Sequence, residues 1–197
     1  MVTSKETRRG VSLAPLRARL PSRCELAPVF AILLFLDFSW SLYHMFFVVP
    51  SWLYYMNVWG VLGLTTYVLA FSLLESALIL ASIVLLCLLF PPHLFREQFI
   101  ALGSATAGVI GLGAVLVQRS IGLIYDMRIW QLLAFPPAIL VGLVLLIWLM
   151  GLVLRRVPLL ARLLSALAER MQVFIWVYLP LGVIGIVVVI IRNLFWI

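Results

Sequence analysis

Long apolar stretches make up most of this chain, and short segments between them carry nearly all of the charged residues. A bilayer core of about 30 Å requires about 20 apolar residues of helix, because each residue advances a helix by about 1.5 Å. Five stretches have about this length, and we expect membrane spans at 26–48, 68–90, 99–118, 137–154 and 173–191. The pattern therefore predicts an all-α fold, a polytopic membrane helical bundle in which 26–197 forms a single domain of five transmembrane helices.

Prolines and aromatic residues indicate where these spans end. We expect the first helix to end at Pro50, whose ring cannot continue it, and the fourth to begin near Pro137. Counted back to Val58, the second stretch would be about 50 Å long, which is too much for one upright span. We therefore place its start near 68 and expect an aromatic belt, or a short helix in the outer interface, before it: Trp52, Tyr54, Tyr55 and Trp59.

Between the fourth and fifth spans, apolar side chains recur at helical spacing opposite Arg162, Ser165 and Glu169. This pattern predicts an amphipathic helix over 158–171 that begins at Pro158 and lies in the inner interface of the membrane. Such a helix either only connects two spans or offers a docking surface to a cytoplasmic partner. Its apolar positions are Leu160, Leu163, Leu164, Leu167 and Met171.

Composition excludes a water-soluble protein. Of the 197 residues, 65% are hydrophobic and 11% are charged, and the mean hydropathy is +1.22. A soluble domain is closer to half apolar and a quarter charged. We therefore expect the lipid bilayer to be the main partner of this chain.

The distribution of basic residues predicts the orientation. If the N-terminus is cytoplasmic, 11 of the 14 Lys and Arg residues lie on the inner side, as the positive-inside rule requires. This places the protein in the cell membrane with an extracytoplasmic C-terminus, and its net charge of +7 faces anionic lipids at the cytoplasmic surface. Segment 1–25 lacks the pattern of a secretory signal, and we expect a disordered cytoplasmic tail or, alternatively, a regulatory contact. We predict no nucleic-acid binding, because the membrane accounts for the basic residues.

Two groups of polar residues fall within the expected spans. Asp37 lies near the middle of the first span, where an ionised carboxylate costs about 2.5 to 3.5 kcal/mol, so it must be neutral, paired or hydrated. Ser41 and His44 follow on the same helical face. In the second span, Glu75 is flanked by Ser72 and Ser76. Three roles are open for these residues. They face a shared polar cavity used for proton or ion passage, or they form hydrogen bonds to other helices. The third alternative is catalysis.

Small residues recur along the third span and predict close helix packing. Gly103, Ala107 and Gly111 are spaced by four, with Ser104 and Gly108 beside them. Small side chains let another backbone approach, and such contacts drive helix association in lipid. We expect a contact within this chain, although a partner chain could occupy the same surface.

Motifs for catalysis and cofactor binding are absent from the sequence. We find no phosphate-binding loop, dinucleotide fingerprint, His-Glu metal motif, Gly-x-Ser-x-Gly or Cys-x-x-Cys, and we expect neither a metal nor a cofactor. The first functional hypothesis is therefore a non-catalytic subunit or scaffold in a membrane complex, with a membrane-protein partner or as a homo-oligomer. The alternatives are a small transporter or proton-coupled channel that uses the carboxylates, and an intramembrane transferase or hydrolase.

Overall fold

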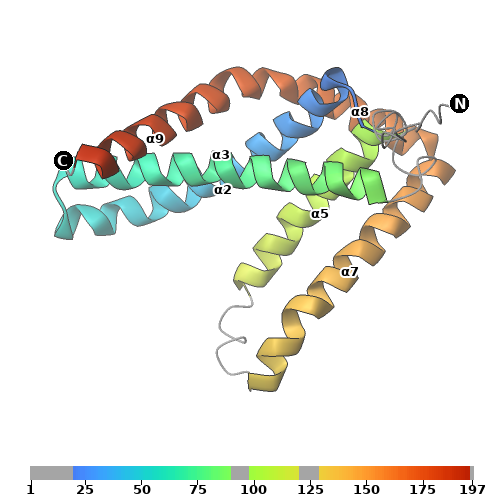
Figure 1. The fold of residues 1–197 in the computed structure, drawn as a ribbon, viewed down its shortest axis with the longest axis horizontal. Helices are drawn as coiled ribbons and strands as arrows, with labels where there is room; N and C mark the ends of the chain where they lie inside the picture. Colours follow the sequence, from blue (N-terminus) through green and yellow to red (C-terminus); the bar gives the residue numbers. More distant parts are fainter. Residues whose placement is uncertain (1–19, 90–97, 120–128, 196–197) are drawn as a thin grey trace, which may run out of the picture.

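Helices account for nearly all of the chain that the computed structural model describes, which is residues 20–89, 98–119 and 129–195. Five segments of these ranges are long and apolar enough to cross a membrane, and no strand occurs among them. The predicted all-α membrane bundle is therefore confirmed. The elements are α2 (Arg23–Tyr55), α3 (Val58–Leu89), α5 (Phe99–Arg119), α7 (Ile129–Arg156), α8 (Pro158–Met171), the 3₁₀ turn η1 (Gln172–Phe174) and α9 (Ile175–Phe195), as Figure 1 shows.

Two helices continue through prolines that were expected to mark their ends. The prediction that the first helix ends at Pro50 is wrong, because α2 runs through this residue to Tyr55. The fourth helix also begins at Ile129, ahead of Pro137. A proline removes one backbone hydrogen bond, and membrane helices tolerate this loss where water or a neighbouring group satisfies the freed carbonyl. Near a helix end that carbonyl is close to water, so the helix need not stop.

Helix α3 begins ten residues before the expected start of the second span. The Asn57 side chain caps it, since Asn57 Oδ1 accepts a hydrogen bond of 2.8 Å from the backbone N–H of Gly60. Among the described residues there is no separate short helix before α3, because the expected aromatic residues lie at the end of α2 and the start of α3. Tyr54, Tyr55 and Trp59 are exposed there, and their position at a membrane interface stays a prediction.

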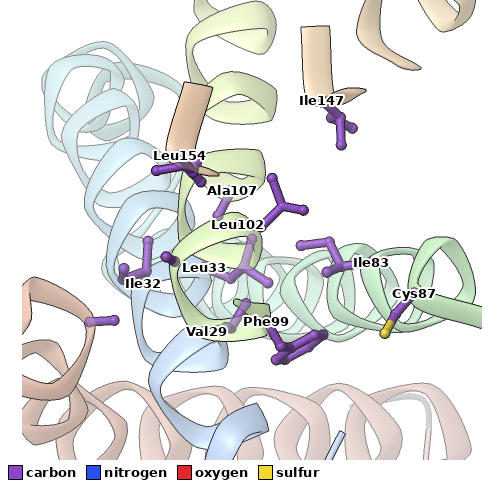
Figure 2. Close-up of a cluster of buried hydrophobic side chains, with 13 residues drawn as sticks. Val29, Ile32, Leu33, Ile83, Cys87, Phe99, Leu102, Ala107, Ile147 and Leu154 are labelled. Carbon is purple, nitrogen blue, oxygen red and sulfur yellow. The ribbon is translucent and has the colours of Figure 1, made fainter. Parts of the chain in front are cut away.

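The helices form two diverging groups that meet at one end. In Figure 1, α2, α3 and α9 run along one another, whereas α5 and α7 lead away from them. At the meeting point, one apolar cluster draws buried residues from α2, α3, α5, α7 and α8 (Figure 2). Val29, Ile83, Phe99 and Leu154 are among its members. The start of α2, the end of α3, the start of α5 and the end of α7 thus meet beside α8. This arrangement is compatible with spans that alternate in direction.

Helices α3 and α9 approach each other at backbone distance. A Cβ built on Gly185 would lie 2.9 Å from the backbone nitrogen of Ala70 and 2.9 Å from the backbone oxygen of Thr66. A Cβ on Gly182 would lie 2.7 Å from Leu73 Cβ. Only glycine fits these two positions without movement of the neighbouring helix, so the pair fixes how closely α9 packs on α3.

The amphipathic segment is helical, as its pattern predicts. Part of its apolar face is packed against the rest of the protein and part is exposed. Leu160, Leu164 and Met171 pack against the buried cluster, whereas Leu163 and Leu167 are exposed. The exposed leucines fit a helix that lies against lipid, but the interfacial position of α8 stays a prediction. Most of the expected tail, 1–25, lies outside the described residues.

Candidate functional site

A cavity of about 540 Å³ lies between α2, α3 and α5. Its polar lining comes from Asp37, Trp40 and Ser41 on α2, Glu75 on α3 and Gln118 on α5. Within the described part of the chain, no Lys or Arg contributes to the lining. The charge that the lining can carry is therefore negative.

The spacing of the α2 residues explains why they reach one cavity. Asp37 and Ser41 are four residues apart and Trp40 lies between them, so all three share a face of the helix. Asp37 is half-buried on this face, and its Oδ2 accepts a hydrogen bond of 2.9 Å from the Ser76 hydroxyl. Ser76 is itself fully buried. This bond joins α2 to α3 and leaves one oxygen of Asp37 outside it.

Glu75 reaches the same cavity from α3, one residue before the serine that bonds Asp37. Its side chain is exposed, whereas the neighbouring Ser72 and Ser76 are buried. Two carboxylates from adjacent helices thus line one cavity, where a negative charge on one repels a negative charge on the other. A cation between them would be attracted by both.

A second, smaller cavity of about 320 Å³ adjoins the first toward the end of α2. Trp40, Ser41 and Gln118 line both cavities, and Trp40 Nε1 donates a hydrogen bond of 3.1 Å to Gln118 Oε1 at their boundary. His44 and Trp52 line the second cavity. The two cavities follow one face of α2, and the indole–amide bond lies between them.

His44 is separated from the two carboxylates by this boundary. Its Nε2 is buried and accepts or donates no hydrogen bond within the described residues. Its ring lies edge-on to Trp40 with the centroids 4.5 Å apart. Of the candidates from the sequence, Asp37, Ser41 and Glu75 therefore line one cavity, His44 lines the next, Ser76 bonds Asp37, and Ser72 lines neither.

Gln118 and Trp40 bond each other at this site, and neither was among the candidate polar residues. Gln118 marks the end of the expected third span, so it was counted as a boundary residue. A signal for it is present, because it continues the face of α5 that carries Gly108, Gly111 and Val115, three or four residues apart. A polar residue at the end of a small-residue face can bond the helix that packs there.

The small-residue positions of α5 divide into a packed and an open part. Ser104 and Ala107 are buried, and a Cβ on Gly103 would lie 2.9 Å from Val29 Cγ2 of α2. In contrast, a Cβ on Gly108 would meet no atom within 4 Å, and one on Gly111 would meet only Leu36, at 3.6 Å. The first half of the face packs on α2, and the second half forms a wall of the larger cavity.

The donor set does not suggest a metal site. Within 20–89, 98–119 and 129–195, no group of three or more His, Cys, Asp or Glu residues is placed to hold a metal ion. Comparison of the chain with protein families, curated proteins and solved structures finds no match in any of the three. Any function must therefore be argued from the residues themselves.

Proposed function

We propose that this chain is a small transporter or proton-coupled channel that uses Asp37 and Glu75 in the cell membrane. The observation that carries the proposal is that both carboxylates line one cavity between α2, α3 and α5. Ionisable residues within membrane spans are costly, and they are usually retained where they serve an ion, a proton or a substrate. The subunit hypothesis, which the sequence alone favoured, gives no specific role to two carboxylates that line the same cavity.

The chemistry of the pair suits exchange of a proton for a cation. The Ser76 hydroxyl stabilises a negative charge on Asp37, and a proton bound by the pair of carboxylates reduces the repulsion between them. A cation that enters the cavity replaces this proton as the neutralising charge, and its departure lets a proton return. Proton and cation thus compete for the same negative charge, which couples their movements.

The proposal includes the orientation that the charges predict, with a cytoplasmic N-terminus and an extracytoplasmic C-terminus. In that orientation α8 is on the cytoplasmic side, and the cavity lined by His44 and Trp52 is nearer the outer side than the carboxylates. The face of α2 from Leu33 to Trp52 covers about 29 Å at helical rise, close to the thickness of the bilayer core. The two cavities together follow α2 over a length close to the thickness of the bilayer core, which supports the proposal of a route along this helix.

Proton flux in proteoliposomes tests the proposal. Vesicles with an internal pH dye report proton movement through the protein, driven by an imposed potassium diffusion potential for a channel and by an imposed cation gradient for an exchanger. We expect Asp37→Asn and Glu75→Gln each to lower the flux at least tenfold, since each removes a charge but preserves side-chain shape. Glu169→Gln, an exposed carboxylate on α8, is the matched control and should leave the flux unchanged. Normal flux in the Asp37→Asn, Glu75→Gln double variant would contradict the proposal.

A second candidate function, a subunit of a membrane complex, is favoured by open small-residue positions elsewhere on the surface. A Cβ on Gly113 of α5 or on Gly142 of α7 would meet no atom within 4 Å. Glycines at such positions allow a helix of another chain to approach closely. Purification in mild detergent should then recover a homo-oligomer or a defined partner that Gly142→Leu releases, and a strictly monomeric protein with full proton flux contradicts this candidate.

A further inference from the structure

The larger cavity combines two carboxylates with walls that are otherwise mostly apolar. Leu33 and Leu36 of α2, Ile79 of α3, and Ile110 and Val115 of α5 surround the acidic groups. Its volume of about 540 Å³ falls within the range of roughly 300 to 1,000 Å³ that is typical of small-molecule sites. A ligand that fills this cavity must place a positive charge near the two carboxylates and apolar groups against the remaining walls.

We infer that this cavity binds a lipophilic organic monocation, with the positive charge at Asp37 and Glu75 and the apolar body against α5. The inference rests on the proposed transport function and names its substrate class. Burial of an aliphatic or aromatic body against these walls supplies most of the affinity, because apolar surface leaves water. The carboxylates select the sign of the charge.

The described lining offers too few oxygen atoms to hold an inorganic cation that has lost most of its water. Calcium takes six to eight oxygen ligands and magnesium requires a near-ideal octahedron, whereas the described lining offers two carboxylates, one hydroxyl and one side-chain amide. The Ser41 hydroxyl and the Gln118 amide are, moreover, on the side of the cavity shared with its neighbour. A delocalised or substituted cation needs fewer oxygen ligands, since its charge is spread over a larger and more weakly hydrated surface.

Trp40 adds a second feature suited to such a ligand. Its indole lines the cavity, and the hydrogen bond from Nε1 to Gln118 Oε1 restricts the rotation of the ring. An indole face attracts a cation that lies within about 6 Å of the ring centroid, and the attraction is strongest where water is excluded. Trp40 is therefore expected to contact the cationic part of the ligand, and the bond to Gln118 positions it.

Two glycines of α5 provide a matched test of where the ligand sits. Gly108 lines the cavity, Gly113 does not, and a Cβ on either would meet no atom within 4 Å. Gly108→Leu therefore adds a side chain to the cavity wall with no clash at its Cβ, whereas Gly113→Leu adds the same side chain to the same helix outside the cavity. Any general effect of leucine on α5 should appear in both variants, and any effect on binding only in the first.

The experiment measures binding of radiolabelled tetraphenylphosphonium to the full-length protein in nanodiscs, with empty nanodiscs subtracted. Tetraphenylborate, which has the same shape and the opposite charge, is the ligand control and is measured in separate samples, because the two ions pair in solution. We expect saturable binding of tetraphenylphosphonium and no saturable binding of tetraphenylborate. Glu75→Gln and Gly108→Leu should each weaken tetraphenylphosphonium binding at least tenfold, and Gly113→Leu should leave it unchanged. Absence of saturable tetraphenylphosphonium binding, equal binding in all variants, or equally strong saturable binding of tetraphenylborate overturns the inference.

Failure of the ligand class and failure of the transport function give different results. If tetraphenylphosphonium does not bind but proton flux depends on Asp37 and Glu75, the transport proposal stands and only the substrate class is wrong. If binding depends on Glu75 and Gly108 but no variant changes flux, the site binds lipophilic cations without transport. Binding thus tests the substrate class, and flux tests the transport function.

Discussion

The contact of Gly185 with α3 gives a test of the fold that does not depend on function. In a Gly185→Ala variant, the added Cβ would lie 2.9 Å from both the Ala70 nitrogen and the Thr66 oxygen. Both are backbone atoms within α3, so neither can rotate away as the end of a flexible side chain would. The two helices must separate instead, and this separation weakens the adjoining packing of Gly182 on Leu73.

The size of the effect follows from the distance that must be gained. An ordinary carbon contact requires about 3.5 Å or more, so the helices must move apart by about half an ångström. Overpacking of this kind costs about 1 to 3 kcal/mol, which is a factor of roughly 5 to 150 in the unfolding equilibrium. The intrinsic helix preference for alanine over glycine offsets at most about 1 kcal/mol of this cost.

Equilibrium unfolding in mixed micelles, with increasing sodium dodecyl sulfate, measures the change. Gly142→Ala is the matched control, because a Cβ on Gly142 would meet no atom within 4 Å. We expect this control to be as stable as the parent chain or slightly more stable, and Gly185→Ala to unfold at a lower detergent fraction. If the two variants have equal stability, the backbone contact between α3 and α9 is refuted.

Two further predictions concern the cavity. Ser76→Ala removes the hydrogen bond to Asp37, and the same assay should show a free energy of unfolding that is lower by about 1 to 2 kcal/mol. Ser72→Ala, at a serine that is also buried, is the control and should lose less. Equal losses would assign no special role to the bond. In a chain whose exposed Cys24 is replaced by Ser, Ser41→Cys should react with a water-soluble thiosulfonate at least tenfold faster than Ser72→Cys, because Ser41 lines both cavities. Equal rates would mean that water does not reach this part of the cavities.

The five helices of membrane-spanning length in the described ranges could be predicted from the sequence, but several of their ends could not. Hydropathy reports which residues prefer lipid, and five apolar stretches of sufficient length are enough to place five helices. The ends depend on local backbone chemistry instead. Asn57 caps α3 well before its most apolar part begins, and α2 passes through Pro50 where the loss of one hydrogen bond is tolerated. Neither outcome is encoded in the hydropathy of the surrounding residues.

The small-residue pattern of α5 shows the same limit for packing. The sequence indicates that backbones approach along this helix, and Gly103 does pack on Val29 of α2. It cannot indicate where the approach ends, because that depends on the angle at which α5 leaves α2. Gly108 is of the same residue type only five residues later, and it faces open space and the cavity.

The candidate site depends in a similar way on the apolar residues beside it. Helical spacing alone puts Asp37 and Ser41 on one face, but it does not determine which neighbour that face meets. Phe38 settles the rotation of α2, since it is fully buried and stacks on Tyr178 of α9 with the ring centroids 5.1 Å apart. Successive residues of a helix are turned by about 100°, so with Phe38 held against α9, Asp37 is turned toward α3 and α5. There the Ser76 hydroxyl bonds it beside Glu75, so an apolar contact with α9 brings the two carboxylates into one cavity.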